Sequence, residues 1–334
     1  MEFRASKRDG LKYGRWSMGS ARRKPHREHR YEAFTPRMAF NLAAPHTWPA
    51  AIMPSLIALA AASCVSEVSV SMALVLLLIV VLMQSSVNTF NDYYDYVKGA
   101  DSAEDNVEES DAVLVYNNVN PAMALRFAIG LLVCAFALGI YAIVVAGFIP
   151  LVIAIVGALF VVLYSAGKSP ISYLPLGEAV SGIVMGGLIP LATYQVLTGD
   201  LNFVVIVWSI PTIIGVGLIM FTNNTCDIER DIPSGRRTLP VLLGRERSVF
   251  VYHTLVYVWL AAIVVNVAVW FTAGLLVIPF MLLAAYPLLK ALFGNTLTPE
   301  RRLQAMPQIL SVNIVLGAFY AAAIFSTASL SLVL

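Results

Sequence analysis

Two aspartates at the end of an apolar stretch have the spacing of a metal site. Asp92 and Asp95 lie three residues apart in NTFNDYYDYVKGAD, so they share one face if the preceding helix continues through them. Carboxylates this close repel each other unless a cation lies between them. Mg²⁺ fits this role because it prefers oxygen ligands, keeps several waters and is usually completed by substrate phosphates. The motif therefore predicts a magnesium site at a helix end.

A second motif, TNNTCDIERDIPSGRRTLP, repeats the design later in the chain. Its carboxylates, Asp227 and Asp231, have the i,i+4 spacing of a helix face and also follow an apolar stretch. Two asparagines precede each acidic pair: Asn88 and Asn91, and Asn223 and Asn224. Because the arrangement recurs, we expect the two acidic helix ends to face each other across one cavity.

Basic residues near these motifs suit a diphosphate. Arginine clamps two phosphate oxygens with its planar fork, while lysine acts as a movable point charge. The alternative interpretation is that these cations only orient the protein in a membrane. No Ser/His/Asp or Cys/His arrangement in the sequence predicts a covalent nucleophile. The candidate cations are Lys98, Lys168 in YSAGKSP, and Arg236 and Arg237 in PSGRRTLP.

The composition predicts that these motifs are held by membrane helices. Hydrophobic residues make up 59% of the 334-residue chain, charged residues only 13%, and the mean hydropathy is +0.77, which exceeds what a soluble core needs. Most apolar segments approach the length of about twenty residues that a bilayer requires. We therefore expect an all-α integral membrane protein with nine transmembrane helices. Their approximate limits are 41–63, 69–90, 122–146, 148–164, 177–197, 203–223, 249–271, 274–293 and 305–328.

The basic residues predict how the spans are oriented. Residues 1–37 contain eleven Lys and Arg against four acids, which predicts a disordered cytoplasmic tail near anionic lipid, followed by a membrane domain at 38–334. With nine spans, all 22 Lys and Arg fall on the tail's side, and only Glu67 and Asp200 are charged on the other. We expect a multi-pass protein of the cell membrane with a cytoplasmic N-terminus and the C-terminus opposite. No nucleic-acid groove is predicted, because exposed aromatics do not alternate with the basic residues.

Three ordered motifs, NDYYD, YSAGKSP and DIERD followed by SGRRTLPVLLG, resemble those of the UbiA-type intramembrane prenyltransferases. The resemblance covers roughly residues 40 to 330 and implies helices around a central cavity. It implies that Asp92 and Asp95 hold one Mg²⁺, that Asp227 and Asp231 hold a second, and that both ions bridge to the diphosphate of an isoprenoid donor. The asparagines would orient the acids. The residues that would neutralise the leaving diphosphate are Lys168, Arg236 and Arg237, and Tyr164 would lie beside the allylic cation.

Within this family, NDYYDYVKGAD and PISYLPLGE look most like the 1,4-dihydroxy-2-naphthoate polyprenyltransferases of menaquinone synthesis. That resemblance implies a decarboxylating transfer to the naphthoate. Other family members carry a third acid at the position of Gly99. Two alternatives stay open: another aromatic acceptor, such as 4-hydroxybenzoate or a homogentisate-like ring, and, from a different class, an ion-coupled transporter. The donor's chain length and the oligomeric state are also left open.

Overall fold

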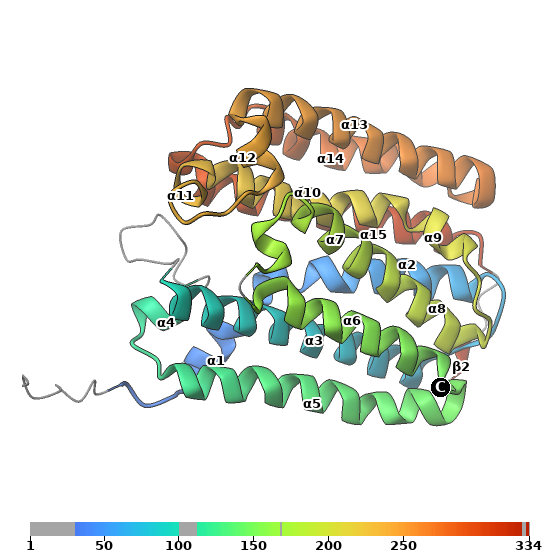
Figure 1. Ribbon diagram of the computed structural model, residues 1–334. Helices are drawn as coiled ribbons and strands as arrows, with labels where there is room; N and C mark the ends of the chain where they lie inside the picture. The colour runs from blue at the N-terminus through green and yellow to red at the C-terminus, as the bar shows by residue number, and fades with distance from the viewer. Residues whose placement is uncertain (1–30, 100–111, 168, 329–331, 334) are drawn as a thin grey trace, which may run out of the picture. The chain divides into compact units, whose positions relative to one another are not determined.

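The computed structural model describes residues 31–99, 112–167, 169–328 and 332–333 (Figure 1). Three predicted features lie outside these residues: most of the basic tail, the acidic loop 101–111, and Lys168. Contacts divide the chain into two units, Met1–Tyr31 and Glu32–Leu334. The first unit has a single described residue, so the fold is that of the second.

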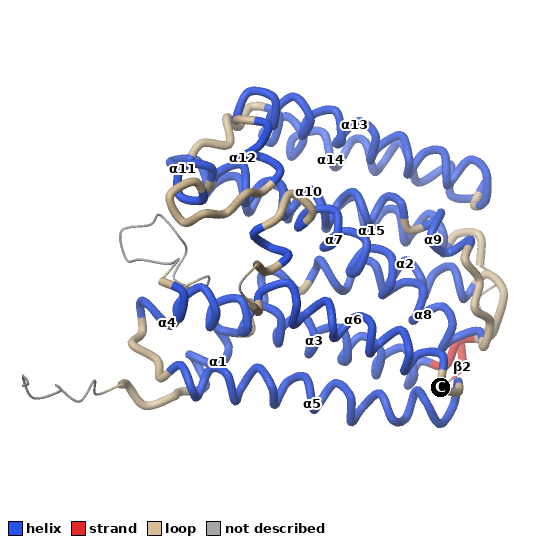
Figure 2. Tube along the Cα trace, viewed as in Figure 1, coloured by secondary structure: helices blue, strands red, loops and turns tan. Residues whose placement is uncertain are grey.

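The described part of the chain is helical, which confirms the predicted all-α class. One short parallel pair of strands, β1 (Val68–Ser69) with β2 (Leu332–Val333), accompanies the helices. The longer helices run side by side, with α13 and α14 at the top of Figures 1 and 2 and α3 and α5 at the bottom. The α-helices are α1 (Pro36–Leu42), α2 (Pro49–Ser63), α3 (Val70–Lys98), α4 (Val113–Tyr116), α5 (Pro121–Ala146), α6 (Ile149–Ser165), α7 (Gly177–Ile183), α8 (Ile189–Thr198), α9 (Val204–Trp208), α10 (Ile210–Cys226), α11 (Ile228–Asp231), α12 (Leu239–Leu243), α13 (Arg245–Trp270), α14 (Ile278–Phe293) and α15 (Arg302–Phe325).

Six helical segments of the described residues are long and apolar enough to cross a membrane. Three of the predicted spans correspond instead to shorter apolar helices: α2, α6 and α10, of 15, 17 and 17 residues. At 1.5 Å per residue, such helices are at most about 25 Å long, less than the roughly 30 Å of bilayer hydrocarbon. The chain is thus a multi-pass membrane protein, and the count of nine spans stays a prediction. The six longer segments are Val70–Lys98, Pro121–Ala146, Gly177–Thr198, Arg245–Trp270, Thr272–Phe293 and Pro299–Phe325.

Prolines in the first turn explain where the shortened helices begin. The predicted segment 41–63 is interrupted, because α1 ends at Leu42, Ala44 has a φ of +45°, and α2 begins at Pro49. Proline suits the first turn of a helix, where its missing N–H has no partner to lose. The predicted segment 203–223 is similarly divided at Ser209, between α9 and α10.

Glycine permits a left-handed backbone at the end of α3 and a close contact between α7 and α10. Gly99 ends α3 with a φ of +68°, a conformation that favours glycine. At Gly182 and Gly186, an added β-carbon would collide with the backbone of Ile213 in α10. These two glycines therefore let α7 and the π-helical segment Val184–Leu188 that follows it lie directly on α10.

Candidate functional site

A single guanidinium joins the two acidic motifs. Nη2 of Arg236 donates to Oδ1 of Asp95 at 2.6 Å, and Nη1 of the same arginine lies 3.8 Å from Oδ1 of Asp231. All three residues are buried. Asp95 belongs to α3 and Asp231 ends α11, so carboxylates far apart in the sequence share one cation.

Burial and the neighbouring charges both shift the pKa values of Asp231 and Arg236. Burial raises the pKa of Asp231 to about 6, against the lowering effect of Arg236 and together with the repulsion from Asp227. The pKa of Arg236 itself lies above its usual value, because Asp95 and Asp231 outweigh the opposing effect of burial. Oδ2 of Asp231 accepts from Thr238 at 3.4 Å, whereas its Oδ1 accepts no hydrogen bond from the described residues. That oxygen is buried and lies 3.8 Å from Nη1 of Arg236.

Arg302 and Arg230 hold the other carboxylate of the second motif. Nε of Arg302 lies 3.2 Å from Oδ1 of Asp227, and Nη2 of Arg230 donates to Oδ2 at 3.1 Å. Arg302 also donates to Oδ1 of Asn223 at 2.7 Å. Sequence patterns predicted no role for Arg302 beyond orientation, because it lies between the predicted spans 274–293 and 305–328, far along the chain from either motif. In the structure it is the first residue of α15.

The remaining polar residues of the first motif connect α3 to its neighbours. Asp92 is buried and accepts from the backbone N–H groups of Val113, at 2.9 Å, and Leu114, at 3.4 Å, at the start of α4. Asn91 accepts from the hydroxyl of Ser165 in α6 at 3.1 Å. The amide of Asn88 donates to Oγ1 of Thr47 at 2.8 Å and to the carbonyl of Ala43 at 3.1 Å.

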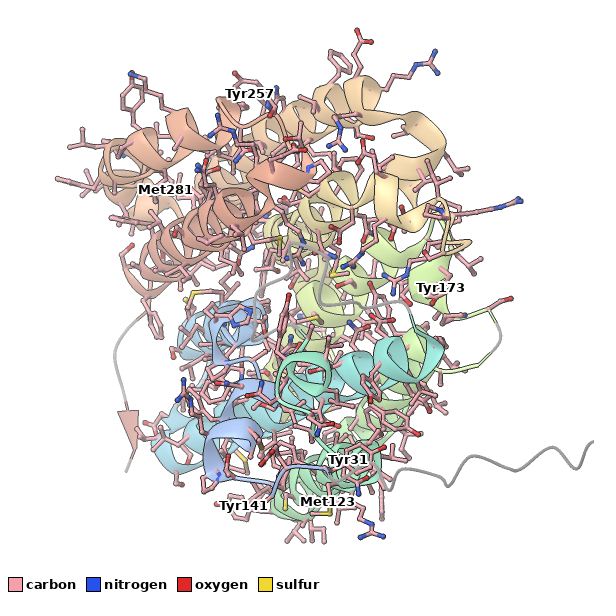
Figure 3. All side chains as sticks on the ribbon, turned by 90° about the vertical axis from the view of Figure 1, so that its left-hand side faces the viewer. Tyr31, Met123, Tyr141, Tyr173, Tyr257 and Met281 are labelled. Carbon is pink, nitrogen blue, oxygen red and sulfur yellow. The ribbon has the colours of Figure 1, made fainter. Side chains whose placement is uncertain are left out.

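Two of the predicted cations flank one aromatic ring. Nζ of Lys98 lies 4.9 Å from the ring centre of Tyr173, and the guanidinium of Arg236 lies 4.8 Å from the same centre. Lys98 also donates to the carbonyl of Ser165 at 2.8 Å. Figure 3 labels Tyr173 near the loops at one end of the helices. The side chain of Arg237 is exposed, while its backbone N–H donates to the Tyr173 carbonyl at 2.8 Å.

Asn224 contacts a carboxylate to which the sequence assigned no role. Its Nδ2 donates to Oε1 of Glu178 at 2.7 Å, and Glu178 is buried. Glu178 ends the motif PISYLPLGE, yet a lone carboxylate at the start of an apolar segment gave no spacing signal. The hydroxyl of Tyr164 is also buried and has no hydrogen-bond partner among the described residues.

A polar cavity of about 170 Å³ lies among these groups. Asp227, Asp231, Asn224, Tyr164, Lys98 and Arg237 do not line it, but the first two pair with arginines that do. The lining therefore combines acids and amides of the first motif with an amide and guanidinium groups of the second. The predicted site residues in its wall are Asn88, Asn91, Asp92, Asp95, Asn223 and Arg236, and Arg230 and Arg302 join them.

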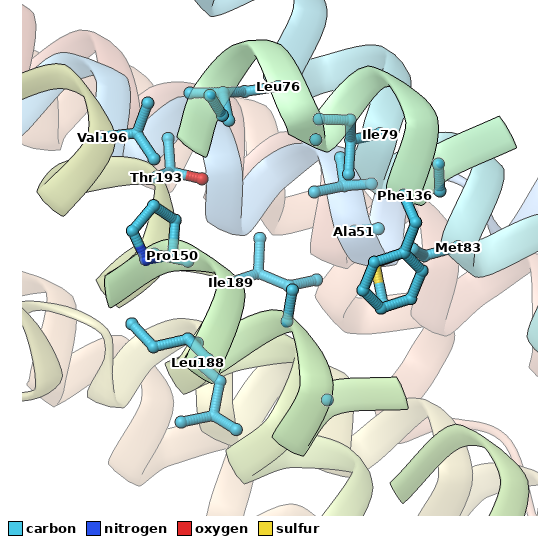
Figure 4. A pocket seen from close by; sticks show the side chains of 18 of the residues that line it. Ala51, Leu76, Ile79, Met83, Phe136, Pro150, Leu188, Ile189, Thr193 and Val196 are labelled. Atoms are coloured by element: carbon cyan, nitrogen blue, oxygen red, sulfur yellow. The ribbon is translucent and has the colours of Figure 1, made fainter. Parts of the chain in front are cut away.

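A second cavity, of about 130 Å³, is apolar (Figure 4). Gln84 and Met185 line both cavities, so the two cavities share part of their walls. Side chains from α2, α3, α5, α6 and α8 surround it, among them Ala51, Leu76, Ile79, Phe136, Pro150 and Val196. The two cavities therefore offer a charged binding region next to an apolar one.

The donor set fits a hard divalent ion that is completed by its substrate. Buried carboxylates and amide oxygens surround the polar cavity, and these are the ligands that Mg²⁺ prefers. Among the described residues, however, no three Asp, Glu, His or Cys side chains gather closely enough to hold an ion by themselves. Bound Mg²⁺ would therefore need further oxygens from water or from a ligand.

Sequence comparison places the chain beside membrane prenyltransferases. Residues 51–329 match the UbiA prenyltransferase family. The chain is 32% identical to 1,4-dihydroxy-2-naphthoate octaprenyltransferase of Bacillus subtilis over 69% of this chain and 74% of that protein. It is 28% identical to the human UbiA prenyltransferase domain-containing protein 1, over 72% of this chain and 69% of the human one.

Solved structures share the fold. A UbiA homologue from Archaeoglobus fulgidus bound to GPP and Mg²⁺ superposes with a TM-score of 0.61 at 16% identity, covering 86% of this chain and 99% of the other. The apo UbiA homologue from Aeropyrum pernix superposes with a TM-score of 0.56, also at 16% identity, covering 86% and 98%. At this identity the likeness concerns the fold alone.

Proposed function

This chain belongs to the UbiA prenyltransferase family, and we propose that it transfers a polyprenyl group from a polyprenyl diphosphate to 1,4-dihydroxy-2-naphthoate with Mg²⁺ as cofactor. The observation that carries the proposal is the contact of Arg236 with both Asp95 and Asp231. It brings the two acidic motifs together beside a polar cavity that shares wall residues with an apolar one. An amphiphilic diphosphate needs both parts.

The acids of the two motifs would hold the metal ions, Asp92 and Asp95 on one side and Asp227 and Asp231 on the other. When bound, Mg²⁺ stabilises the negative charge that develops on the departing diphosphate. The Mg²⁺-bound fold neighbour supports this choice of cofactor, as does the oxygen-only donor set. Asp231 Oδ1, buried without a hydrogen bond, is a specific oxygen that a metal would satisfy.

The cations of the site would bind the diphosphate and stabilise it as it leaves. Arg236 and Arg302 line the polar cavity, and Lys98 lies beside them over the ring of Tyr173. Fixed positive groups in a site with little water stabilise a leaving anion strongly, because they need no reorganisation during the reaction. Lys168 and Arg237 are proposed to assist. Asn88 and Asn91 would orient the acids of the first motif indirectly, by holding α3 against its neighbours, and Asn223 would position Arg302.

The apolar cavity would hold the isoprenoid chain. With the chain in this cavity, C1 of the donor would lie near Gln84 and Met185, the two residues that line both cavities. Excluding water matters here, because an allylic cation at C1 reacts with water as readily as with an aromatic ring. The proposed reaction breaks the bond from C1 to the diphosphate oxygen and forms one from C1 to an electron-rich ring carbon. Loss of carbon dioxide from that carbon restores the aromatic ring.

The naphthoate acceptor and a role in menaquinone synthesis rest on two supports. One is the named activity of the Bacillus subtilis relative, and the other is the motif PISYLPLGE. A 4-hydroxybenzoate or homogentisate-like acceptor is the runner-up. We place the N-terminus and both acidic motifs in the cytoplasm because every Lys and Arg sorts to that side when nine spans are counted.

Purified protein in lipid nanodiscs tests the proposal directly. We expect prenylated naphthol, carbon dioxide and diphosphate in equal amounts when dihydroxynaphthoate, a polyprenyl diphosphate and Mg²⁺ are all present, and no product after chelation of the metal. Faster product formation with 4-hydroxybenzoate or homogentisate than with the naphthoate would refute the acceptor assignment. The absence of diphosphate release with every aromatic acceptor would refute the transfer reaction itself.

A further inference from the structure

Glu178 has a buried oxygen without a hydrogen-bond partner. The residue is only 5% exposed; its Oε1 accepts from Asn224 at 2.7 Å, while its Oε2 accepts no hydrogen bond from the described residues. Burying a polar atom without a partner costs free energy, so such atoms in an ordered site commonly mark the place of a ligand. The proposed reaction assigns no role to Glu178.

Glu178 itself lines neither cavity, but the segment that carries it borders the polar one. Ser181 and Met185, about one and two turns further along the same side of the segment, line that cavity. Contact at Gly182 and Gly186 keeps this segment against α10, which supplies Asn224. The amide of Asn224 fixes one carboxylate oxygen and thereby the orientation of the other.

A second unpartnered polar atom lies close by on α6. The hydroxyl of Tyr164 is buried without a hydrogen bond, and it lies 3.6 Å from where a β-carbon on Gly177, the neighbour of Glu178, would stand. A carboxylate oxygen only accepts hydrogen bonds, whereas a phenol both donates and accepts. Together they match a ring hydroxyl, which donates to one group and accepts from the other.

We propose that Glu178, assisted by Tyr164, binds a hydroxyl group of the aromatic acceptor. The inference rests on the proposed function, because it requires a hydroxylated aromatic substrate. The acceptor hydroxyl donates to Oε2 of Glu178 and accepts from Tyr164, and its proton stays on the hydroxyl oxygen. A hydrogen bond to a carboxylate polarises the O–H bond and enriches the ring in electrons, which favours attack on C1. The same bond holds the ring in one orientation.

The test combines Glu178→Gln with acceptors whose hydroxyl groups are methylated one at a time. Glutamine keeps the volume and can still accept from Asn224, but it presents an N–H₂ group in place of the free oxygen. For the unmodified acceptor we expect kcat/KM to fall on the order of 10- to 100-fold, as the loss of a hydrogen bond to a charged group produces. One of the two methyl ethers should cause a similar loss in the wild type and little further loss in the variant.

Donor binding separates this role from a purely structural one. The variant should bind a non-hydrolysable polyprenyl diphosphate analogue with Mg²⁺ as tightly as the wild type does. The matched control is Glu229→Gln, which changes an exposed carboxylate paired with Arg245 and should keep wild-type kinetics.

Three results overturn the inference: unchanged acceptor kinetics in Glu178→Gln, additive losses from the variant and from both methyl ethers, or an equal loss of donor binding. If instead the proposed function is wrong, the experiment gives a different result. In that case the wild-type protein itself would prenylate no hydroxylated aromatic compound.

Discussion

Replacing Arg236 by methionine probes the contact that joins the two motifs. At an effective dielectric constant of 20, a unit charge pair attracts by roughly 6 kcal/mol at the 2.6 Å of the Asp95 contact and roughly 4 kcal/mol at the 3.8 Å of the Asp231 contact. Desolvation of the buried groups offsets much of this attraction. Breaking a buried pair by removing one partner typically costs about 3–5 kcal/mol, because the other charge is left uncompensated.

We therefore expect Arg236→Met to lower the free energy of unfolding by about 3–5 kcal/mol in the absence of Mg²⁺. The assay is denaturant titration in mixed micelles with chelator present. Arg237→Met is the matched control, because that side chain is exposed and should change stability by less than about 0.5 kcal/mol. Combining Arg236→Met with Asp95→Asn should recover part of the loss, since it removes a stranded charge.

An Arg236→Met variant as stable as the wild type without metal would refute this reasoning. So would strictly additive effects of the Arg236 and Asp95 substitutions. Either result would mean that the contact contributes nothing to holding the two motifs together.

Further substitutions test other parts of the account. Asp92→Ala or Asp227→Ala should abolish turnover while membrane insertion, followed by fractionation, stays intact; near-normal activity in either variant would contradict the metal assignment. Arg302→Met should weaken binding of a donor analogue at least 10-fold, as loss of a hydrogen bond to a charged group does, and unchanged binding in a direct titration would count against its proposed contact with diphosphate. Gly186→Val should destabilise the protein by about 1–3 kcal/mol through collision with Ile213, which unfolding measurements would reveal or exclude. Deleting residues 1–30 should change the rate little, and a truncated enzyme with much lower activity would assign the tail a catalytic role.

The sequence predicts the helical class and the chemistry of the acids, because both depend on local patterns. Apolar runs of about twenty residues and carboxylates at helical spacing are readable without a structure. The partners of those acids are not. Arg302 reaches Asp227 from the start of α15, and Glu178 reaches Asn224 across two helices held close by glycines. Such contacts depend on how distant helices pack.

The limits of the helices also depend in part on features that the local sequence does not reveal. The sequence located the apolar segment 41–63, but the break between α1 and α2 depends on the backbone at Ala44. The aromatic ring that Lys98 and Arg236 both contact is another example, because nothing in the motif PISYLPLGE singles out Tyr173 as their partner. The two acidic motifs were informative because the same pattern, two asparagines followed by two aspartates at helical spacing, occurs in both.

Counting bound metal ions tests the central claim most directly, namely that the two motifs form one diphosphate site. Mn²⁺ can replace Mg²⁺ and be followed by electron paramagnetic resonance with a non-hydrolysable polyprenyl diphosphate analogue present. We expect two ions per wild-type chain with dipolar coupling between them, and one ion after either Asp95→Asn or Asp231→Asn. Two uncoupled ions, or two ions that survive both substitutions, would contradict the account.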